Sequence, residues 1–303
     1  MKRGKLSSRV KNLLVLHATV FIWGFTGLLG ALISVSAIYL VWYRVIIAFI
    51  ALYIYFIVAG TNIKVSKNAL ISLIFTGAVV ALHWVLFFYA IKLSTVSVTL
   101  VCLSSLTLFT SFLEPMFSSK KVSKLEVLTG LSIIAGISLI FEFEARYTLG
   151  IICALTSALC ASIFSIINSK QIKNRAAPLI AFYELAGAAL WISVYLAITE
   201  GLNTSIKLLP GDLFYLLILG TICTALAYVA GVSVMKELSA FRVALITNLE
   251  PVYGIILAWL FLGKKEQMTP GFYFGATIIL SAVFLHPYLK NKLEKRKLRK
   301  RLN

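Results

Sequence analysis

Residues 12–34 read NLLVLHATVFIWGFTGLLGALIS, an apolar run that contains no charged residue. A helix needs about 20 such residues to cross a bilayer. Strands of a membrane barrel instead alternate polar and apolar residues over about ten positions, and the run shows no such alternation. The apolar region of a signal peptide is shorter than this one, although basic residues precede both. The run therefore predicts a first membrane-spanning helix.

Comparable apolar runs follow along the rest of the chain, and only brief segments rich in Gly, Pro, Asn, Ser and Lys connect them. These segments are too short to hold a soluble domain. The sequence therefore predicts an all-α integral membrane protein with ten transmembrane helices. The nine further runs cover residues 38–58, 69–91, 95–117, 125–141, 149–168, 178–199, 213–235, 240–262 and 271–289.

The composition of the whole chain agrees with this prediction. Of the 303 residues, 60% are apolar and 13% are charged, whereas soluble domains are about 45–50% apolar and about 25% charged. The four cysteines lie inside apolar runs without the spacing of a metal site or a disulfide framework. These observations exclude a soluble enzyme, a secreted disulfide scaffold and a nucleic-acid-binding domain.

The net charge of +18 is distributed unevenly between the two sides of the predicted membrane protein. With an even number of spans, both termini share one side, and 23 of the 29 Lys and Arg residues fall there, in the tails 1–11 and 290–303 and in four loops. Five fall on the other side, and Arg44 lies within a span. The positive-inside rule predicts that both termini are cytoplasmic in a multi-pass protein of the plasma or inner membrane.

The second half of the chain repeats the first, with offsets that drift by a few residues in the loops. Each half has five spans, an odd number, so the two halves cross the membrane in opposite directions. Inverted repeats are typical of alternating-access carriers that bind substrate near the midplane. We expect repeats at 12–143 and 147–289. Matches at an offset of 145 are Ser94 with Ser239, Val98 with Val243, Leu100 with Leu245 and Gly130 with Gly275.

Several short motifs carry a resemblance to a known family. They are Trp23-Gly24-Phe25, the pair Tyr43-Arg44, and a C-terminal stretch with LEPVYG at 249–254, LGKKE at 262–266 and Gly275-Ala276. Through the order of these motifs over residues 10–290, the chain resembles the ten-helix members of the drug/metabolite transporter superfamily with two EamA-type halves. The first half departs from the pattern, because Lys121 stands where the second half has Glu266.

The resemblance implies a carrier for small organic metabolites, often an exporter, with a cavity between the two halves. Members of the superfamily handle amino acids, cofactors, sugars and drugs, so the resemblance does not identify the substrate.

Glu250 is the leading candidate for a functional residue, because it lies near the middle of span 9, where an ionisable side chain is energetically expensive. The next residue, Pro251, cannot donate a backbone hydrogen bond and crowds the carbonyl of Thr247. A carboxylate beside such a loosened turn can bind a cation, a proton or an ammonium group. The alternative is that Glu250 only fixes helix packing. Asn248 and Tyr253, on either side of it, are further candidates for the substrate cavity.

Arg44 and Glu184 occupy matching positions in the two halves. Each lies about 9 Å from its own membrane face at a rise of 1.5 Å per residue, so about 12 Å separates them across a 30 Å core. This favours opposite mouths of one cavity, where the two charges select a zwitterion, over a direct ion pair. Alternatively, Arg44 extends to the outer interface and Glu184 is structural.

The remaining candidates are His83 and three aromatic residues, Trp23, Trp84 and Tyr228. His83 can relay protons, although a single histidine in a membrane more often joins two helices by a hydrogen bond. The aromatic side chains can line the cavity for flat or apolar substrates; tryptophans also anchor proteins at the interface.

The sequence thus predicts a secondary transporter that exports a small amino-acid-like or drug-like metabolite by alternating access, with proton coupling left open. The alternative is a flippase for a lipid-linked or amphipathic substrate. We expect no enzyme activity, because catalytic and metal-binding motifs and a phosphate-binding loop are missing from the sequence. We expect no cofactor, and the expected partners are the substrate and membrane lipid, with a monomer or weak homodimer.

Overall fold

The computed structural model of the chain describes residues 8–117, 123–199 and 208–302. Within these ranges, ten helical segments are long and apolar enough to cross a membrane, as the sequence predicts. The elements are α1 Ser8–Leu32, α2 Ala37–Ala59, α3 Lys67–Leu93, α4 Val96–Leu103, α5 Leu106–Met116, α6 Lys124–Phe143, η1 Ala145–Tyr147, α7 Thr148–Gln171, α8 Ala177–Thr199, α9 Pro210–Gly220, η2 Thr221–Leu226, α10 Ala227–Val234, α11 Ala240–Thr247, α12 Leu249–Leu262, η3 Gly263–Glu266 and α13 Pro270–Leu302.

Part of the predicted charge distribution falls outside the described residues. Lys2, Arg3, Lys5, Lys120, Lys121 and Lys207 belong to this part, as do the side chains of Arg9 and of residues 294–303 in the basic C-terminal tail. The contrast between Lys121 and Glu266 therefore stays a statement about the sequence.

Capping side chains set several helix starts. Ser66 accepts a hydrogen bond from the Ala69 amide, Thr95 from Val98 and Ser239 from Arg242. Such bonds satisfy amides that have no partner inside the helix. Helix α6 begins with a complete capping box, in which Ser123 and Glu126 bond to each other's backbone amides.

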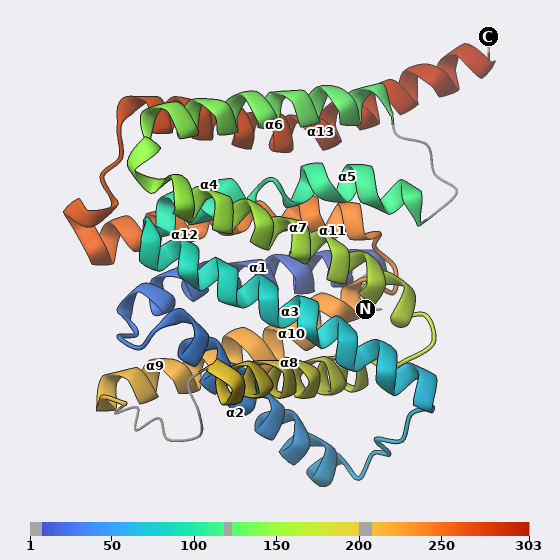
Figure 1. Cartoon of the computed structure of the whole chain (residues 1–303). Coiled ribbons are helices and arrows are strands. Elements are labelled where there is room, and N and C mark those ends of the chain that lie inside the picture. Colours follow the sequence, from blue (N-terminus) through green and yellow to red (C-terminus); the bar gives the residue numbers. More distant parts are fainter. Residues whose placement is uncertain (1–7, 118–122, 200–207, 303) are drawn as a thin grey trace, which may run out of the picture.

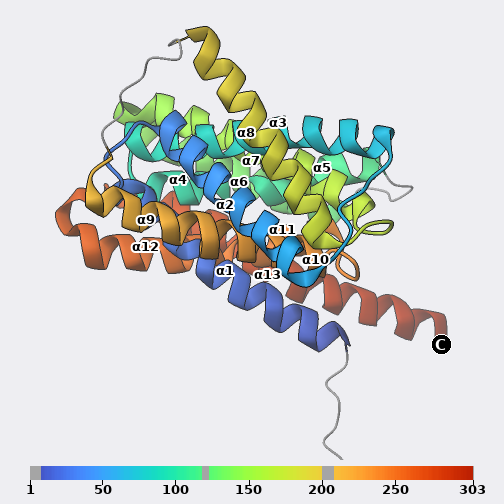
Figure 2. The same cartoon turned by 90° about the horizontal axis from the view of Figure 1, so that it is seen from below.

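Successive spans run back and forth between two ends of the bundle (Figure 1). We call the end where α1 begins and α13 finishes the terminal end, which also holds residues 60–66 and 235–239. The other, distal, end holds residues 33–36, 94–95 and 263–269. Helix α13 continues past the bundle at the terminal end, which a second view also shows (Figure 2).

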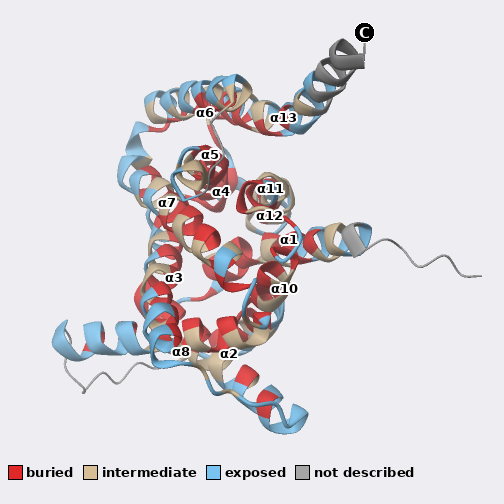
Figure 3. Cartoon of the chain, turned by 90° about the vertical axis from the view of Figure 1, so that its right-hand side faces the viewer, coloured by how far each residue is buried: buried red, intermediate tan, exposed pale blue. Residues whose placement is uncertain are grey.

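Equivalent spans of the two halves lie against each other, α2 on α8 and α6 on α13. The α6–α13 pair forms one edge of the bundle (Figure 3). It packs closely, because a Cβ atom on Gly136 would lie 2.8 Å from the carbonyl oxygen of Gly275. Large apolar side chains such as Phe261 and Phe274 are exposed on the periphery. An apolar exterior of this kind is suited to contact with lipid.

Three spans are not continuous α-helices. Span 4 is divided at Ser104–Ser105, between α4 and α5, and span 9 at Asn248, between α11 and α12. The second interruption lies where Pro251 predicts a loosened turn. Span 8 contains the π-helical turn η2 between α9 and α10. Discontinuous spans place helix ends and backbone polar groups near the midplane, where transporters bind substrate.

Candidate functional site

A cavity that is partly open to solvent lies between the two halves, and its empty space together with the adjoining open solvent is about 810 Å³. Side chains from both repeats surround it, and they include aromatic, aliphatic and polar groups. Its lining residues are Trp23, Thr26, Arg44, His83, Trp84, Phe87, Leu103, Leu106, Ala161, Phe164, Ser165, Asn168, Tyr228, Gly231, Val232, Met235, Val243, Ala244, Thr247 and Glu250.

The cavity extends from the middle of the bundle to the terminal end. Met235 follows directly after α10, and Asn168 lies in the last turn of α7, so both lining residues are at that end. Toward the distal end, the lining stops at Thr26 and Phe87, each six residues before its helix finishes. Six residues of helix span about 9 Å, so a layer of that thickness separates the cavity from the distal end.

Polar contacts close the distal end. Asp212 at the start of α9 accepts hydrogen bonds from the Ser34 amide at 2.7 Å and the Ser34 hydroxyl at 2.5 Å. Lys92 at the end of α3 donates to the carbonyl of Ile33. These contacts tie the segment between α1 and α2 to α3 and α9.

Glu266 closes the same end between spans 4 and 9. Its buried carboxylate accepts bonds from the Val96 amide at 3.1 Å, the Ser97 amide at 2.9 Å and the Ser97 hydroxyl at 2.7 Å. A carboxylate at the N-terminus of a helix satisfies unpaired amides and opposes the positive end of the helix dipole. The acidic residue of the second-half motif thus caps α4, in the first half.

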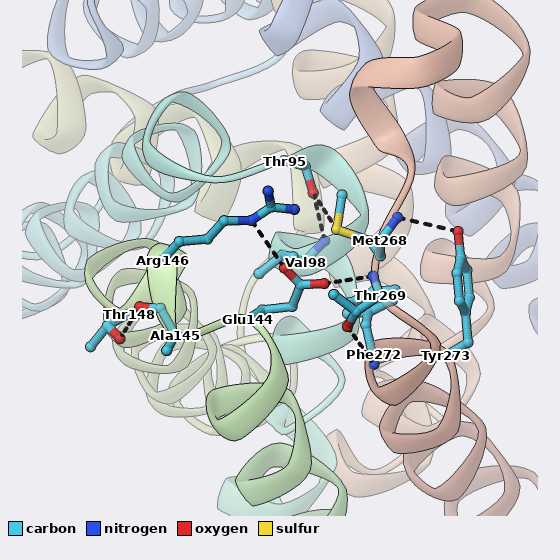
Figure 4. A network of polar contacts seen from close by, with 10 residues as sticks. All are labelled: Thr95, Val98, Glu144, Ala145, Arg146, Thr148, Met268, Thr269, Phe272 and Tyr273. Atoms are coloured by element: carbon cyan, nitrogen blue, oxygen red, sulfur yellow. Dashed lines mark hydrogen bonds and ion pairs between the residues drawn. The ribbon is translucent and has the colours of Figure 1, made fainter.

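Glu144 fixes the residues that follow Glu266, before the start of α13 (Figure 4). It is fully buried, accepts from the Thr269 amide at 2.8 Å, and forms an ion pair with Arg146 at 3.3 Å. Through Glu266 and Glu144, residues 266–269 are fixed to both α4 and α6.

Arg44 points into the cavity from α2 and is only 1% exposed. Its Nε donates to the hydroxyl of Thr224 at 2.6 Å, whereas its Nη1 has no hydrogen-bond partner among the described residues. Thr224 lies in the π-helical turn and donates its own proton to the Leu219 carbonyl. The structure therefore places Arg44 inside the protein and not at the outer interface, the alternative that its depth in the span left open.

Glu250 lies in the first turn of α12 and lines the cavity at 6% exposure. Within the described part of the chain, its carboxylate has no hydrogen-bond partner, and it interacts electrostatically with Arg44. The cavity therefore presents a guanidinium and a carboxyl group whose hydrogen-bonding capacity is not fully used by the described residues.

Glu184 is completely buried and lies behind the cavity wall, not in it. Its Oε2 accepts from the Tyr228 hydroxyl at 2.7 Å and from the Asn168 side-chain amide at 3.1 Å. Glu184 and Arg44 form no ion pair in the described structure, and they do not flank opposite mouths of the cavity. Glu184 reaches the cavity only through Tyr228 and Asn168, which both line it.

His83 joins α3 to α7 while its ring lines the cavity. Its Nδ1 lies 3.0 Å from the Ser157 carbonyl and 2.8 Å from the Ser157 hydroxyl, which donates its proton to the His83 carbonyl. Because both Ser157 oxygens act as acceptors toward Nδ1, that nitrogen carries the hydrogen and Nε2 is an acceptor. The interhelical bond expected of a single membrane histidine is present.

Of the other candidates, Trp23 lines the cavity, whereas Asn248 and Tyr253 do not. The Asn248 amide donates to the Thr107 hydroxyl at 2.5 Å and to the Ala244 carbonyl at 2.9 Å, so it joins the break in span 9 to α5 of span 4. Tyr253 packs edge-on against Phe21, with ring centres 5.3 Å apart. Both residues support α12 from outside the cavity.

Several residues at the site are not predictable from the sequence motifs, among them Phe87, Phe164, Asn168, Ser157 and Thr224. Asn168 and Thr224 carry a signal in the sequence, because each is a polar residue inside or at the end of an apolar run. The two phenylalanines carry no such signal in a chain with 20 of them.

Comparisons with known proteins agree with this architecture. The sequence model of the EamA-like transporter family matches the chain twice, over residues 10–142 and 148–286. No curated protein matches the chain. Among solved structures, 27 chains match. One of them, described only as "Crystal structure of protein", has a TM-score of 0.70 at 16% identity, covering 93% of this chain and 99% of that chain. At this identity the likeness shows the fold alone.

Proposed function

The chain belongs to the EamA-like transporter family, whose members are membrane transporters of small solutes, and from this premise we propose that it carries an amino-acid-like metabolite. The proposed mechanism is secondary transport by alternating access. Drug-like amphipathic molecules are the alternative class of substrate. Two inverted halves around one cavity support this mechanism.

The observation that carries the proposal is the pairing of Arg44 and Glu250 in one cavity. The unpartnered Nη1 of Arg44 can donate to a substrate carboxylate, and the Glu250 carboxylate can accept from a substrate ammonium group. Charge-assisted bonds of this kind are the strong ones in water-poor sites. A zwitterion satisfies both groups at once, whereas a simple anion or cation leaves one buried charge without a partner.

The walls between these two groups favour an apolar or flat side chain. Trp23, Trp84, Phe87, Phe164 and Tyr228 all line the cavity. Aromatic side chains offer large apolar faces together with polar edges. We therefore choose L-phenylalanine as the first probe, and a small polar amino acid such as L-serine as its comparator.

The side on which the cavity is open supports export as the proposed direction of transport. The cavity reaches the terminal end, and the positive-inside rule places that end in the cytoplasm of the plasma or inner membrane. A carrier in this conformation loads substrate from the cytoplasm, which suits export. The proposal includes a monomer or weak homodimer in contact with membrane lipid.

Counterflow in proteoliposomes tests the proposal. Vesicles preloaded with unlabelled L-phenylalanine should take up the labelled amino acid faster with protein than without it. Glu250→Gln and Arg44→Gln should each raise KM about tenfold or more, since a charge-assisted bond contributes about 1.5–3 kcal/mol. Glu142→Gln is the matched control, because Glu142 is an exposed acid at the distal end of α6.

Unchanged KM values in both variants, with Glu142→Gln also unchanged, would remove the zwitterion site from the mechanism. Absence of counterflow for every amino acid and amphipathic cation in a broad panel would overturn the transport proposal itself.

A further inference from the structure

Glu184 is a buried carboxyl group that substrate recognition by Arg44 and Glu250 does not use. It lies in α8 with an exposure of 0%, and both of its side-chain hydrogen bonds end on the same oxygen, Oε2. Its second oxygen, Oε1, is buried and has no partner within the described structure.

The hydrogen bonds around Glu184 leave two acceptors without a donor. The Asn168 side-chain amide donates to Glu184 and to the Tyr228 hydroxyl, and Tyr228 donates its proton to Glu184. The donors of this cluster are therefore already committed, while Glu184 Oε1 and Asn168 Oδ1 receive no hydrogen bond from any described residue. One additional proton on the carboxyl group would supply a missing donor.

Positive charge near Glu184 does not compensate for its burial. On α10 the facing titratable group is Tyr228; on α7 the contact is the neutral Asn168. On α2, Arg44 faces the Trp84 ring and Thr224, and on α3, His83 is bound to Ser157. Among the described residues, none of the Lys, Arg or His side chains forms an ion pair with Glu184. A buried charge without a partner is strongly disfavoured relative to the neutral form.

The α3–α8 helix crossing beside Glu184 is closely packed. A Cβ atom on Gly77 of α3 would lie 2.4 Å from the Glu184 carbonyl oxygen, and one on Gly187 of α8 would lie 2.5 Å from the Ile74 carbonyl oxygen. The two backbones are therefore in direct contact at this level. Tyr228 and Asn168, which bond to the Glu184 side chain, line the cavity and connect Glu184 to it.

We propose that Glu184 is a proton-binding site that couples transport to the proton gradient, with Tyr228 and Asn168 connecting it to the cavity. In the described conformation, open toward the terminal end, the carboxyl group holds one proton. Release of that proton leaves a carboxylate that needs water or a cation, and this favours a conformation in which the α7–α8–α10 junction is opened. The proton passes between Glu184 and solvent, and no other bond is made or broken.

This inference rests on the proposed transport function and separates two roles among its acidic residues. Glu250 faces the cavity near Arg44 and binds substrate, whereas Glu184 lies behind the wall without a countercharge and binds the proton. The sequence suggested Glu250 as the first site for a coupling proton; the surroundings of the two carboxyl groups favour Glu184.

Infrared spectroscopy of the purified full chain tests proton binding without any substrate. At neutral pH, the difference between wild type and Glu184→Gln should contain the C=O band of a protonated carboxyl group. Gln has the shape of the protonated acid and retains an oxygen acceptor for Tyr228 and Asn168, so the variant should fold. Carboxylate bands in the difference spectrum would show that Glu184 is ionised and would overturn the proposal.

Transport measurements with L-phenylalanine then test the coupling. In wild-type vesicles an imposed pH gradient should drive net movement of the probe against its concentration gradient. Glu184→Gln should lose this accumulation while retaining counterflow at equal pH, and Glu250→Gln should instead raise KM in both assays. If wild-type counterflow is present but a pH gradient has no effect, the coupling inference fails and the transport proposal stands. If counterflow itself is absent, the transport proposal fails, and the infrared result still decides whether Glu184 is protonated.

Discussion

The guanidinium carbon of Arg44 lies 4.1 Å from the centre of the Trp84 ring, over its face. The opposite half of the chain reaches the same ring, because Tyr228 contacts Trp84 edge-on with ring centres 5.7 Å apart. Trp84 is therefore placed between the positive group of the cavity and the hydroxyl that holds Glu184. A change at this ring is expected to affect substrate recognition more than folding.

Replacing Trp84 by Leu should weaken binding of L-phenylalanine. The cation–π contact contributes about 1 kcal/mol, and its loss lets the Arg44 side chain move, so KM in counterflow should rise about fivefold. Trp84→Phe keeps an aromatic face and should show a smaller change. Trp259→Phe is the control, because Trp259 is exposed on the periphery. An equal KM in the Leu and Phe variants would show that the aromatic face does not position Arg44.

Thr224 should be required to hold Arg44 in place. Thr224→Val has nearly the same shape but leaves the Arg44 Nε–H buried without an acceptor, which costs about 1.5–3 kcal/mol. We expect a lower melting temperature in detergent and a raised KM in counterflow, both restored by Thr224→Ser. If Thr224→Val behaves like wild type and Thr224→Ser does not, the methyl group and not the hydroxyl would be the important part of the side chain.

The contact between Arg44 and Thr224 could not be predicted from the sequence. Run lengths predicted ten spans because length and polarity alone decide whether a helix can cross a bilayer. The depth of Arg44 in its span was also predictable, but an arginine at that depth can face lipid, the interface or the interior. The choice depends on the π-helical turn at Thr221–Leu226, which rotates Thr224 toward Arg44 and has no periodic signature in the sequence.

The breaks in spans 4 and 9 make the same point. Pro251 predicted an interruption near Glu250, because a proline removes a backbone donor, and α11 does end at Thr247. The break at Ser104–Ser105 in span 4 contains neither proline nor glycine, so the sequence does not predict it. Likewise, the depth of Glu184 was readable from the sequence, but its position behind Tyr228 depends on the rotation of α8 against α3.

Ser157 should stabilise the α3–α7 contact without being essential for it. Ser157→Ala removes the hydroxyl that bonds to His83 Nδ1 and to the His83 carbonyl, but the Ser157 backbone carbonyl still accepts from Nδ1. We expect a loss of about 1 kcal/mol in the free energy of unfolding. Thermal unfolding in detergent measures the loss, with Ser132→Ala on the exposed face of α6 as control. A melting temperature equal to that of the control would contradict a structural role for the hydroxyl.

Carboxylates cap the two broken helices from opposite ends, and this arrangement gives the sharpest test of alternating access. At the distal end Glu266, from the segment after α12, binds the amides of Val96 and Ser97 at the start of α4. At the terminal end Glu114 of α5 binds the amide of Phe241 at the start of α11, at 3.1 Å. Each half of the chain thus caps the discontinuous span of the other half.

Glu266→Gln should open the distal end, because an amide can accept only on its oxygen and its NH₂ group then faces the donors of Val96 and Ser97. The closed conformation should lose about 1–3 kcal/mol, which shifts the population toward the state open at the distal end. A cysteine at Ala161, in the cavity wall, reports the shift in a variant without the four native cysteines. A membrane-impermeant maleimide should label it from the terminal side in the parent protein and additionally from the distal side in Glu266→Gln.

Glu114→Gln supplies the opposite control for this measurement. Weakening the terminal cap should leave distal labelling at the parent level and maintain or increase labelling from the terminal side. Because the two substitutions make the same chemical change at opposite ends, a general loosening of the bundle would raise distal labelling in both variants. Distal labelling that rises only in Glu266→Gln identifies Glu266 as the closure of that end; labelling that rises equally in both would contradict that role.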